Sequence, residues 1–284
     1  MKKTLLTICL VWMCFSLSAQ KIIDLSGKWS FSIDRQDNGE KEKWFSHTLN
    51  DFINLPGSMP EKLKGDEVTA KTQWTGSLYD SSYYYNPYME KYRKEGNIKF
   101  PFFLTPDKHY VGAAWYQKEV NIPADWKGER ILLFLERPHI ETTVWVNGQK
   151  TGMQNSLCVP HQYDITRYVR PGKCTITIRV DNRIKEINVG PDSHSITDQT
   201  QGNWNGIVGR ICLQTTPKTY FDDIQIYPEP EQKLARVKVV IKGTGTAKVK
   251  LSAESFNTDK KHIVPAIQQL SLIHISEPTR HAQI

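Results

Sequence analysis

Val144-Trp145-Val146-Asn147-Gly148 is the stretch that decides the fold class, because an Asn-Gly pair directly follows residues of high β propensity. Asn-Gly after alternating apolar residues is the strongest short-range signal for a β-hairpin, since both turn residues tolerate positive φ. Strand patterns lie on both sides of it. Residues 131–135 are continuously apolar, and residues 175–180 alternate between polar and apolar. We therefore predict an all-β protein.

The strands are short and turn signals separate them at regular intervals, which is typical of a β-sandwich or jelly roll. The prolines of Pro228-Glu229-Pro230-Glu231 interrupt this pattern. We expect one sandwich over residues 20–218 and a second β-domain from residue 219, with a hairpin over residues 237–256. The second domain has about three strands, whereas a complete sandwich needs about seven.

The two ends of the chain have patterns of their own. Residues 1–19 combine Lys2 and Lys3 with a short apolar run and a small Ser18-Ala19 pair. This pattern predicts a signal peptide and a secreted or periplasmic protein, the alternative being a buried N-terminal helix. Leu270–Arg280 resembles a translated sequencing-library adapter, so we expect residues 270–284 to be a non-native tail, the alternative being a natural strand.

Composition excludes several classes of function. The formal net charge is +7, but the basic residues are scattered, which argues against a nucleic-acid partner. After the first nineteen residues no segment is apolar enough to predict membrane insertion. Cys158, Cys174 and Cys212 form no Cys-x-x-Cys pair, so we expect no zinc site; one bridge with a free thiol and three buried thiols both stay open. No phosphate-binding or dinucleotide motif occurs, and we expect no cofactor or metal.

Seven local motifs follow one another in a fixed order. They are Leu25–Phe31, Leu55–Ser58, Ala114–Pro123, Leu133–Arg137, Val144–Gly148, Val180–Arg183 and Trp204–Arg210, with Asp164-Ile165-Thr166 between the fifth and the sixth. Together they resemble the N-terminal sugar-binding domain of glycoside hydrolase family 2, the β-galactosidase and β-glucuronidase family. The last motif departs from the commoner Gly-Ile-x-Arg pattern, because Gly209 precedes Arg210.

The resemblance implies an all-β fold: a galactose-binding-like jelly-roll β-sandwich over residues 20–218, followed by an incomplete immunoglobulin-like β-sandwich over residues 219–269. It also implies that the whole protein is a retaining exo-β-glycosidase, with β-galactosidase first and β-glucuronidase or β-mannosidase next. In this chemistry two carboxyl groups about 5 Å apart act as acid/base and nucleophile. The family keeps both on a (β/α)₈ barrel, so we expect no catalytic residue within this chain.

A polar loop before the last motif is the candidate sugar site. Sugar recognition combines polar side chains that bond hydroxyls with an aromatic face, and the loop offers Asp198, Gln201, Asn203, Trp204 and Asn205. By the resemblance, Asp198 or Asn203 would bond a hydroxyl and Trp204 would form a wall. The alternative is a solvated loop with a core tryptophan.

Other noticeable residues favour structural roles. We expect Trp115-Tyr116 to pack in the core, Asn147 to provide the positive φ that its turn requires, and Asp181-Asn182 to cap a strand end. His139, His161 and His194 are too scattered to bind a metal. Residues 70–110 are rich in tyrosine and phenylalanine, with Trp74, and do not alternate, which predicts an aromatic loop inserted between strands.

Two other functions stay open beside the glycosidase. The chain could be a stand-alone carbohydrate-binding module, for which the aromatic insertion is suitable, or a cell-surface β-sandwich protein. In each case the expected partner is an oligosaccharide or glycoside. The resemblance also leaves a homo-oligomer open, because members of the family often oligomerise.

Overall fold

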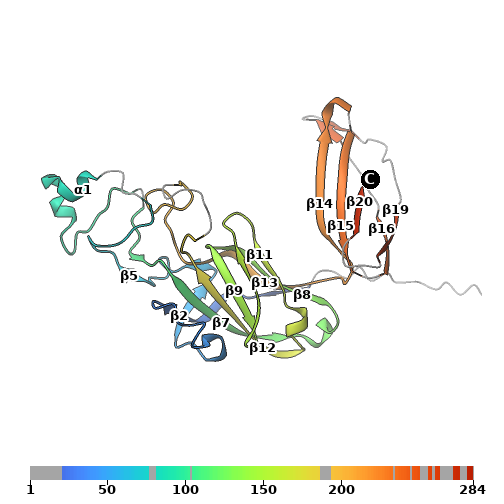
Figure 1. The fold of residues 1–284 in the computed structure, drawn as a ribbon, viewed down its shortest axis with the longest axis horizontal. Helices are drawn as coiled ribbons and strands as arrows, with labels where there is room; N and C mark the ends of the chain where they lie inside the picture. The colour runs from blue at the N-terminus through green and yellow to red at the C-terminus, as the bar shows by residue number, and fades with distance from the viewer. Residues whose placement is uncertain are drawn as a thin grey trace, which may run out of the picture.

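The computed structural model describes residues 21–76, 81–102, 104–185, 193–232, 234–243 and 245–249, and the backbone of four short strands beyond them. The predicted signal peptide, residues 1–19, lies outside the described residues. Antiparallel strands form two groups, a larger one from blue to the light orange of β13 and a smaller one in darker orange to red (Figure 1). The prediction of an all-β fold is confirmed.

The first sheet is built around strand β13, which runs through its centre in the order β1-β13-β8-β11, with β4 also paired to β13. Its strands are β1 (Ile22–Asp24), β4 (Gly57–Ser58), β8 (Arg130–Pro138), β11 (His161–Asp164) and β13 (Gly206–Thr216). The β4 pairing joins Ser58 to Gly206, directly after the polar loop. An early segment of the chain therefore lies beside the candidate sugar site.

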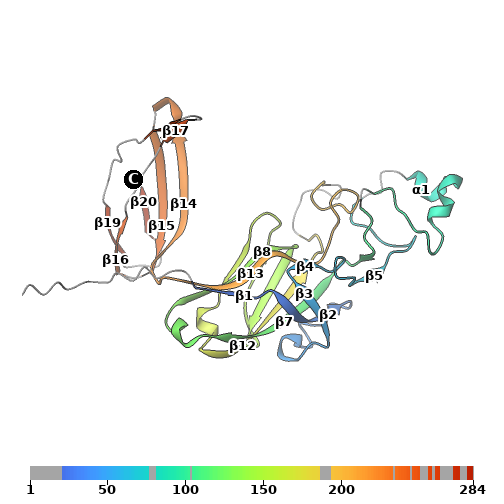
Figure 2. The same cartoon turned by 180° about the vertical axis from the view of Figure 1, so that it is seen from behind.

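The second sheet has six strands in the order β10-β9-β12-β7-β2-β3. These strands are β2 (Gly27–Asp34), β3 (Asp51–Leu55), β7 (Ala113–Ile122), β9 (Glu141–Val146), β10 (Gln149–Asn155) and β12 (Gly172–Asp181). The 3₁₀ turns in its connections are η1 (Trp44–Ser46), η3 (Ala124–Trp126) and η4 (Thr166–Tyr168). Figure 2 shows the same strands from behind.

The core lies between these two sheets. Leu133 and Leu135 of the first sheet belong to one buried cluster with Tyr116, Ile176 and Ile178 of the second. Full burial of such a side chain stabilises the fold by about 1.5–3 kcal/mol. Two sheets that bury their facing side chains in this way form the predicted β-sandwich.

A smaller aromatic cluster covers the outer face of the second sheet. Trp115 and Trp145 pack there with their ring centroids 5.0 Å apart, together with Leu49 and the turn residues Trp44 and Phe45. Tyr116, the neighbour of Trp115, points the opposite way into the main core, as alternation along a strand requires. The prediction that Trp115-Tyr116 is structural is confirmed.

The hairpin predicted at Asn147-Gly148 is present between β9 and β10. Val146 pairs with Gln149, so the loop has two residues, and their φ values are 50° and 77°. This is the left-handed pair of a type I′ turn. The Asn147 side chain also accepts a hydrogen bond from the backbone N–H of Thr175 at 2.9 Å, which ties the turn to β12.

Gly209, which breaks the commoner family pattern, produces a β-bulge. The register between β13 and β8 shifts between Val208 and Ile211, and Gly209 has a φ of 76°. A Cβ at this position would lie 2.8 Å from the Glu136 side chain, so both the conformation and the space require glycine. The extra residue is thus absorbed within the strand.

A second group of strands follows β13. It contains β14 (Tyr220–Glu229), the turn η5 (Pro230–Gln232), β15 (Leu234–Lys242), β16 (Gly245–Val249), β17 (Ser255–Asn257), β18 (Lys260–His262), β19 (Ser271–Ile275) and β20 (Arg280–Gln283). The predicted 237–256 hairpin is wrong. The strands on either side of Gly243 belong to different sheets, because β15 pairs with β14 and β20 whereas β16 pairs with β19. The non-native origin of residues 270–284 stays a prediction.

The aromatic insertion predicted within residues 70–110 lies at the loop end of the sandwich. Its elements are β5 (Asp66–Glu67), α1 (Ser82–Tyr85), the turn η2 (Pro87–Tyr92) and β6 (Lys108–His109). Strands β5 and β6 pair with each other and close the base of the insertion. Within the described residues, no helix is long and apolar enough to cross a membrane.

Candidate functional site

A hollow of about 400 Å³ lies at the end of the sandwich where the polar loop meets the insertion. Four of the five predicted site residues line it, namely Asp198, Gln201, Asn203 and Trp204. The insertion contributes residues 104–107 and His109 to its lining, and Ser58, Pro60 and Glu61 line it as well. The structure therefore brings most of the predicted site together around one cavity.

Asp198 is buried and organises the loop. Its Oδ1 accepts a hydrogen bond from the backbone N–H of Asn203 at 2.6 Å. Its Oδ2 accepts one from the backbone N–H of Thr75 at 2.7 Å and lies 3.2 Å from Nε2 of His109. Because protein donors engage both carboxylate oxygens, the main role of Asp198 is to join the loop to the insertion.

Asn203 is also buried, but its amide is only half engaged. Its Nδ2 donates to Oγ1 of Thr75 at 2.9 Å and to the carbonyl oxygen of Asn182 at 3.0 Å. Its Oδ1 has no hydrogen-bond partner among the described residues. A buried acceptor without a partner costs about 1–3 kcal/mol, so the Asn203 amide is less well satisfied than the Asp198 carboxylate.

Trp204 forms an aromatic wall of the hollow and is held by His139. The two rings are stacked with their centroids 4.5 Å apart. His139 Nδ1 donates to the carbonyl oxygen of Trp204 at 2.8 Å, which fixes the proton on this nitrogen. Burial lowers the pKa of His139 to about 4, partly offset by that hydrogen bond, so the ring is neutral near pH 7.

Gln201 and Asn205 have opposite environments. Gln201 is exposed on the rim of the hollow, where its amide can reach a ligand. Asn205 is 0% exposed and does not line the hollow. Its Nδ2 donates to the carbonyl oxygens of Gly112 and Val180 at 2.9 and 3.0 Å, and its Oδ1 accepts from the Tyr116 hydroxyl at 2.8 Å.

The assignment of Asn205 to the sugar site is therefore corrected. All its hydrogen-bonding groups serve to join the loop to the two sheets, because the residue directly precedes β13 and turns inward with it. A polar residue in a polar loop gives no sequence signal for this difference.

Sequence reasoning missed the residues that the insertion contributes. Thr75 lies at its start and His109 at its end, and both contact Asp198. Trp74 packs against His109 with ring centroids 4.6 Å apart, which supports this contact. The clustered aromatic residues of the insertion signalled a folded segment, but nothing in the sequence indicated that it faces the polar loop.

The charge of the hollow is negative. Its lining includes the carboxylates Glu61, Asp107 and Asp198, and no lysine or arginine belongs to it within the described part of the chain. Hydrogen-bond acceptors therefore dominate this wall. Such a surface favours the hydroxyl groups of a sugar over a carboxylate.

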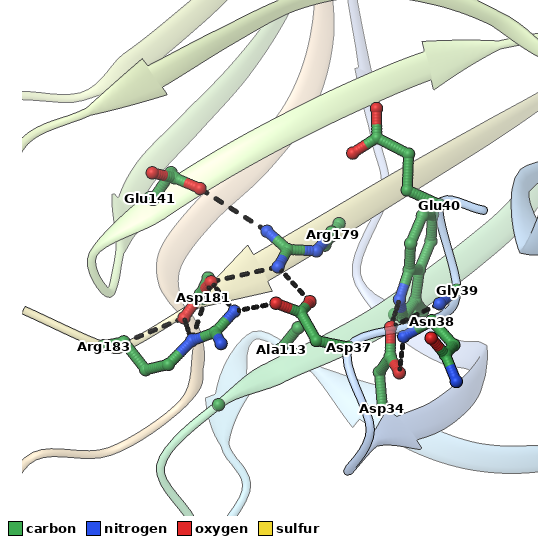
Figure 3. A network of polar contacts seen from close by, with 12 residues as sticks. Asp34, Asp37, Asn38, Gly39, Glu40, Ala113, Glu141, Arg179, Asp181 and Arg183 are labelled. Carbon is green, nitrogen blue, oxygen red and sulfur yellow. Dashed lines mark hydrogen bonds and ion pairs between the residues drawn. The ribbon is translucent and has the colours of Figure 1, made fainter. Parts of the chain in front are cut away.

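An ion-pair network fixes the end of β12 (Figure 3). The buried Asp181 accepts hydrogen bonds from Arg179 at 3.0 Å and Arg183 at 2.6 Å, and Lys185 lies 2.8 Å away. Burial alone would raise the pKa of Asp181, but these cations hold it well below its usual range. Asp37 bridges the two arginines and so attaches the turn after β2.

The network positions Asn182, the next residue. Asn182 accepts a hydrogen bond from the backbone N–H of Gly112 at 2.8 Å and donates to the carbonyl oxygen of Tyr110 at 2.9 Å. Its own carbonyl oxygen receives the Asn203 amide. The structural interpretation of Asp181-Asn182 is confirmed, and the pair supports the hollow from below.

No group of histidine, cysteine and carboxylate side chains in the described residues is arranged to hold a metal ion. His139 and His161 are buried and form hydrogen bonds, whereas His194 is exposed. Cys158 is exposed, Cys174 and Cys212 are buried, and none of these three forms a disulfide. Burial raises the pKa of Cys174 to about 11, so its thiol is unreactive near pH 7.

A comparison with known families decides the class of this domain. The sequence profile described as "Glycosyl hydrolases family 2, sugar binding domain" matches residues 22–217. The chain belongs to this family. The match begins at β1 and ends directly after β13, so the family 2 domain coincides with the two-sheet sandwich.

Relatives of this family 2 chain are named β-glucuronidase. The human protein is 24% identical over 266 residues, which is 84% of this chain and 35% of the human protein. The protein of Paenibacillus borealis is 25% identical over 222 residues, which is 73% of this chain and 31% of that protein. The chain thus spans about a third of the length of the curated relatives it matches.

Solved structures give the same fold. The β-glucuronidase of Ruminococcus gnavus, in complex with uronic isofagomine, superposes with a TM-score of 0.57 at 18% identity. The superposition covers 90% of this chain and 38% of that one. This likeness supports the family 2 fold of the chain.

Proposed function

We propose that the whole protein is a retaining exo-β-glycosidase that removes terminal β-linked glucuronic acid, and that this chain is its sugar-recognising N-terminal part. The observation that carries the proposal is the hollow at the end of the family 2 sandwich, which gathers Asp198, Gln201, Asn203 and Trp204. In this proposal the two catalytic carboxyl groups belong to a (β/α)₈ barrel outside this chain. The protein is exported by the signal peptide predicted at residues 1–19.

The names of the relatives support glucuronic acid as the terminal sugar. We expected β-galactosidase first from the sequence, but the relatives described above are β-glucuronidases. For this reason we prefer β-glucuronidase to β-galactosidase and β-mannosidase in this proposal.

The hollow provides part of the recognition that this activity needs. The Gln201 amide can bond sugar hydroxyls, and the Trp204 ring provides a face for the apolar side of the ring. The hollow is acidic, so it is unsuited to the carboxylate of glucuronic acid. We therefore place the cation that recognises this carboxylate in the catalytic part of the protein, with the present chain bonding hydroxyls.

The test is hydrolysis of a panel of nitrophenyl β-D-glycosides by the complete protein and by the 284-residue chain alone. We expect the complete protein to have its highest kcat/KM on the glucuronide and to release the sugar first as the β-anomer, as retention requires. We expect the 284-residue chain to hydrolyse none of them.

Two results would contradict the proposal. Turnover by the 284-residue chain alone would place catalysis within the sandwich. A folded complete protein without activity on any glycoside of the panel would instead favour the stand-alone carbohydrate-binding module. A preference for galactoside or mannoside would retain the glycosidase and reject only its sugar.

A further inference from the structure

The aromatic insertion is a folded platform on the sandwich. The buried ring of Tyr83 packs on Phe100 with centroids 4.8 Å apart, and Phe100 packs on Trp74 at the same distance. The Tyr83 hydroxyl donates to the carbonyl oxygen of Tyr92 at 3.1 Å, and the Arg93 guanidinium donates to the carbonyl oxygen of Tyr83. These contacts fix α1 and η2 on an aromatic base.

Three tyrosines project from the outer surface of this platform. Tyr84, Tyr85 and Tyr88 are 50%, 72% and 86% exposed. In both views α1 lies at one extremity of the molecule, beyond the strands of the sandwich (Figure 1 and Figure 2). Exposed rings on a fixed base form a ready stacking surface, because little conformational entropy is lost when they bind.

Lysines lie next to the ring of Tyr92, which ends the same turn η2 that contains Tyr88. Lys91 and Lys99 are exposed, and their Nζ atoms lie 4.9 and 5.8 Å from the centroid of the Tyr92 ring. Lys94 is also exposed but pairs with Glu90 at 3.1 Å. Residues 81–102 contain four basic and two acidic side chains, so the platform is positive by two charges, unlike the acidic hollow.

We propose that Tyr84, Tyr85 and Tyr88 with Lys91 and Lys99 form a binding surface for an acidic polysaccharide. Tyrosine rings stack on the apolar faces of successive sugar rings, and the ammonium groups attract carboxylates or sulfates along the chain. The two features occur together here on one rigid segment. The site is separate from the hollow and recognises the interior of a polymer rather than its terminal sugar.

The composition of the surface favours a polysaccharide over other macromolecules. A nucleic acid has one charge per phosphate, and its binding depends on neutralising many of them, which two free lysines do not provide. A protein interface has lysine depleted from its core, whereas here Lys91 and Lys99 lie beside an aromatic ring of the same segment, Tyr92. Sugars with a carboxylate on alternate residues match both the rings and the low charge density.

Such a surface would add avidity to an exo-acting enzyme. An enzyme that acts on chain ends meets few ends in a polymer solution, and a second contact raises the local concentration of ends near the hollow. This consequence depends on the proposed function, whereas binding by the platform does not.

The experiment is affinity gel electrophoresis of the 284-residue chain through gels that contain hyaluronan, polygalacturonate or the neutral polymer dextran. We expect retardation by the two acidic polymers and none by dextran, with a dissociation constant that rises with salt. The Tyr85→Ala/Tyr88→Ala variant should bind at least about fivefold more weakly, because two stacking contacts are lost. Lys91→Gln/Lys99→Gln should remove most of the salt dependence.

The matched controls make the same kinds of substitution at positions outside the platform. Tyr227→Ala removes a tyrosine that is 49% exposed on β14, and Lys41→Gln/Lys127→Gln removes two exposed lysines of the sandwich. Both should bind as the unaltered chain does, and circular dichroism should show that every variant is folded.

Several outcomes would overturn the inference. They are unchanged binding by the tyrosine variant, equal retardation by dextran, no retardation at all, or tighter binding of single-stranded DNA than of hyaluronan. The proposed function fails separately, through the activity of the complete protein on nitrophenyl glycosides. That activity should be unchanged in Tyr85→Ala/Tyr88→Ala, because a small substrate does not reach the platform.

Discussion

The Asp198 carboxylate accepts a hydrogen bond from the backbone N–H of Thr75 at 2.7 Å, across 123 residues of sequence. The Thr75 carbonyl oxygen in turn receives the backbone N–H of Asp198 at 3.1 Å. These reciprocal bonds join the polar loop to the insertion. The two walls of the hollow therefore depend on each other, and a change at Asp198 affects both.

Asp198→Asn should destabilise the protein. An asparagine amide has one acceptor oxygen, whereas the carboxylate has two. Its NH₂ group would therefore point at a backbone N–H that the carboxylate accepts from in the unaltered chain, and two donors would face each other. We expect a loss of about 1–3 kcal/mol in the free energy of unfolding, measured by urea denaturation. The control is Asp223→Asn, since Asp223 is exposed on β14. Equal stability of the Asp198 variant and the unaltered chain would show that the junction does not form.

Asn205→Ala should be at least as damaging, although the residue lies in the predicted sugar loop. It removes three buried hydrogen bonds and leaves the Tyr116 hydroxyl without its acceptor. We expect a loss of about 3 kcal/mol in the free energy of unfolding. A stable Asn205→Ala protein with weakened sugar recognition would reverse our correction of its role.

Gln201→Ala should have the opposite effect, because its side chain is exposed at the hollow. In the complete protein we expect KM for the nitrophenyl glucuronide to rise about tenfold, as loss of a ligand hydrogen bond implies, without a change in melting temperature. Gln232→Ala, at an exposed position in η5, is the matched control. Unaltered kinetics in the Gln201 variant would remove this residue from the site.

The acid stability of the chain should depend on Asp181. A carboxylate whose folded-state pKa is lowered contributes stability above its unfolded pKa near 4, and this contribution is lost as the pH falls further. Asp181→Asn should cost about 3 kcal/mol at pH 7, because Arg179, Arg183 and Lys185 lose the buried carboxylate that they share and keep only Asp37 or Glu141. The difference from the unaltered chain should shrink below about pH 4. A pH-independent difference would contradict this account of the network.

His139 should produce a second pH dependence at higher pH. Its folded-state pKa of about 4 lies below the unfolded value of about 6.5, so the folded state resists protonation. Stability is then complete above pH 6.5 and falls by up to about 3 kcal/mol as the pH approaches 4.

His139→Asn should reduce this slope, since asparagine does not titrate and can still donate to the Trp204 carbonyl oxygen. Part of the slope should remain, because burial also lowers the pKa of His161. His47→Asn on the surface is the control. Thermal melts between pH 7 and 4.5 measure the effect, and parallel curves for the His139 variant and the unaltered chain would exclude it.

Local features of this fold could be predicted from the sequence. The Asn147-Gly148 turn and the core position of Trp115-Tyr116 depend on neighbouring residues only, so periodicity and turn chemistry were sufficient. The sandwich as a whole followed from the ordered motifs. The pairing of strands around Gly243 did not, because a glycine turn between two strand patterns does not show whether the strands stay in one sheet.

The candidate site was predictable in location but not in detail. A polar loop with one tryptophan indicated the hollow, whereas the burial of Asn205 depends on contacts with Tyr116 and Gly112, about ninety residues earlier. The insertion's part in the site depends on the Thr75–Asp198 contact, which is equally distant in sequence. Such contacts become visible only once the strands have been arranged.

The most direct test of the central claim is to sequence the source DNA past the codon for Gln269. We predict that the reading frame continues through the second β-sandwich into a (β/α)₈ barrel that carries two glutamates placed for retaining hydrolysis. A frame that ends soon after Gln269, or that continues only into further β-sandwiches, would contradict the glycosidase and leave a binding or adhesive protein in its place.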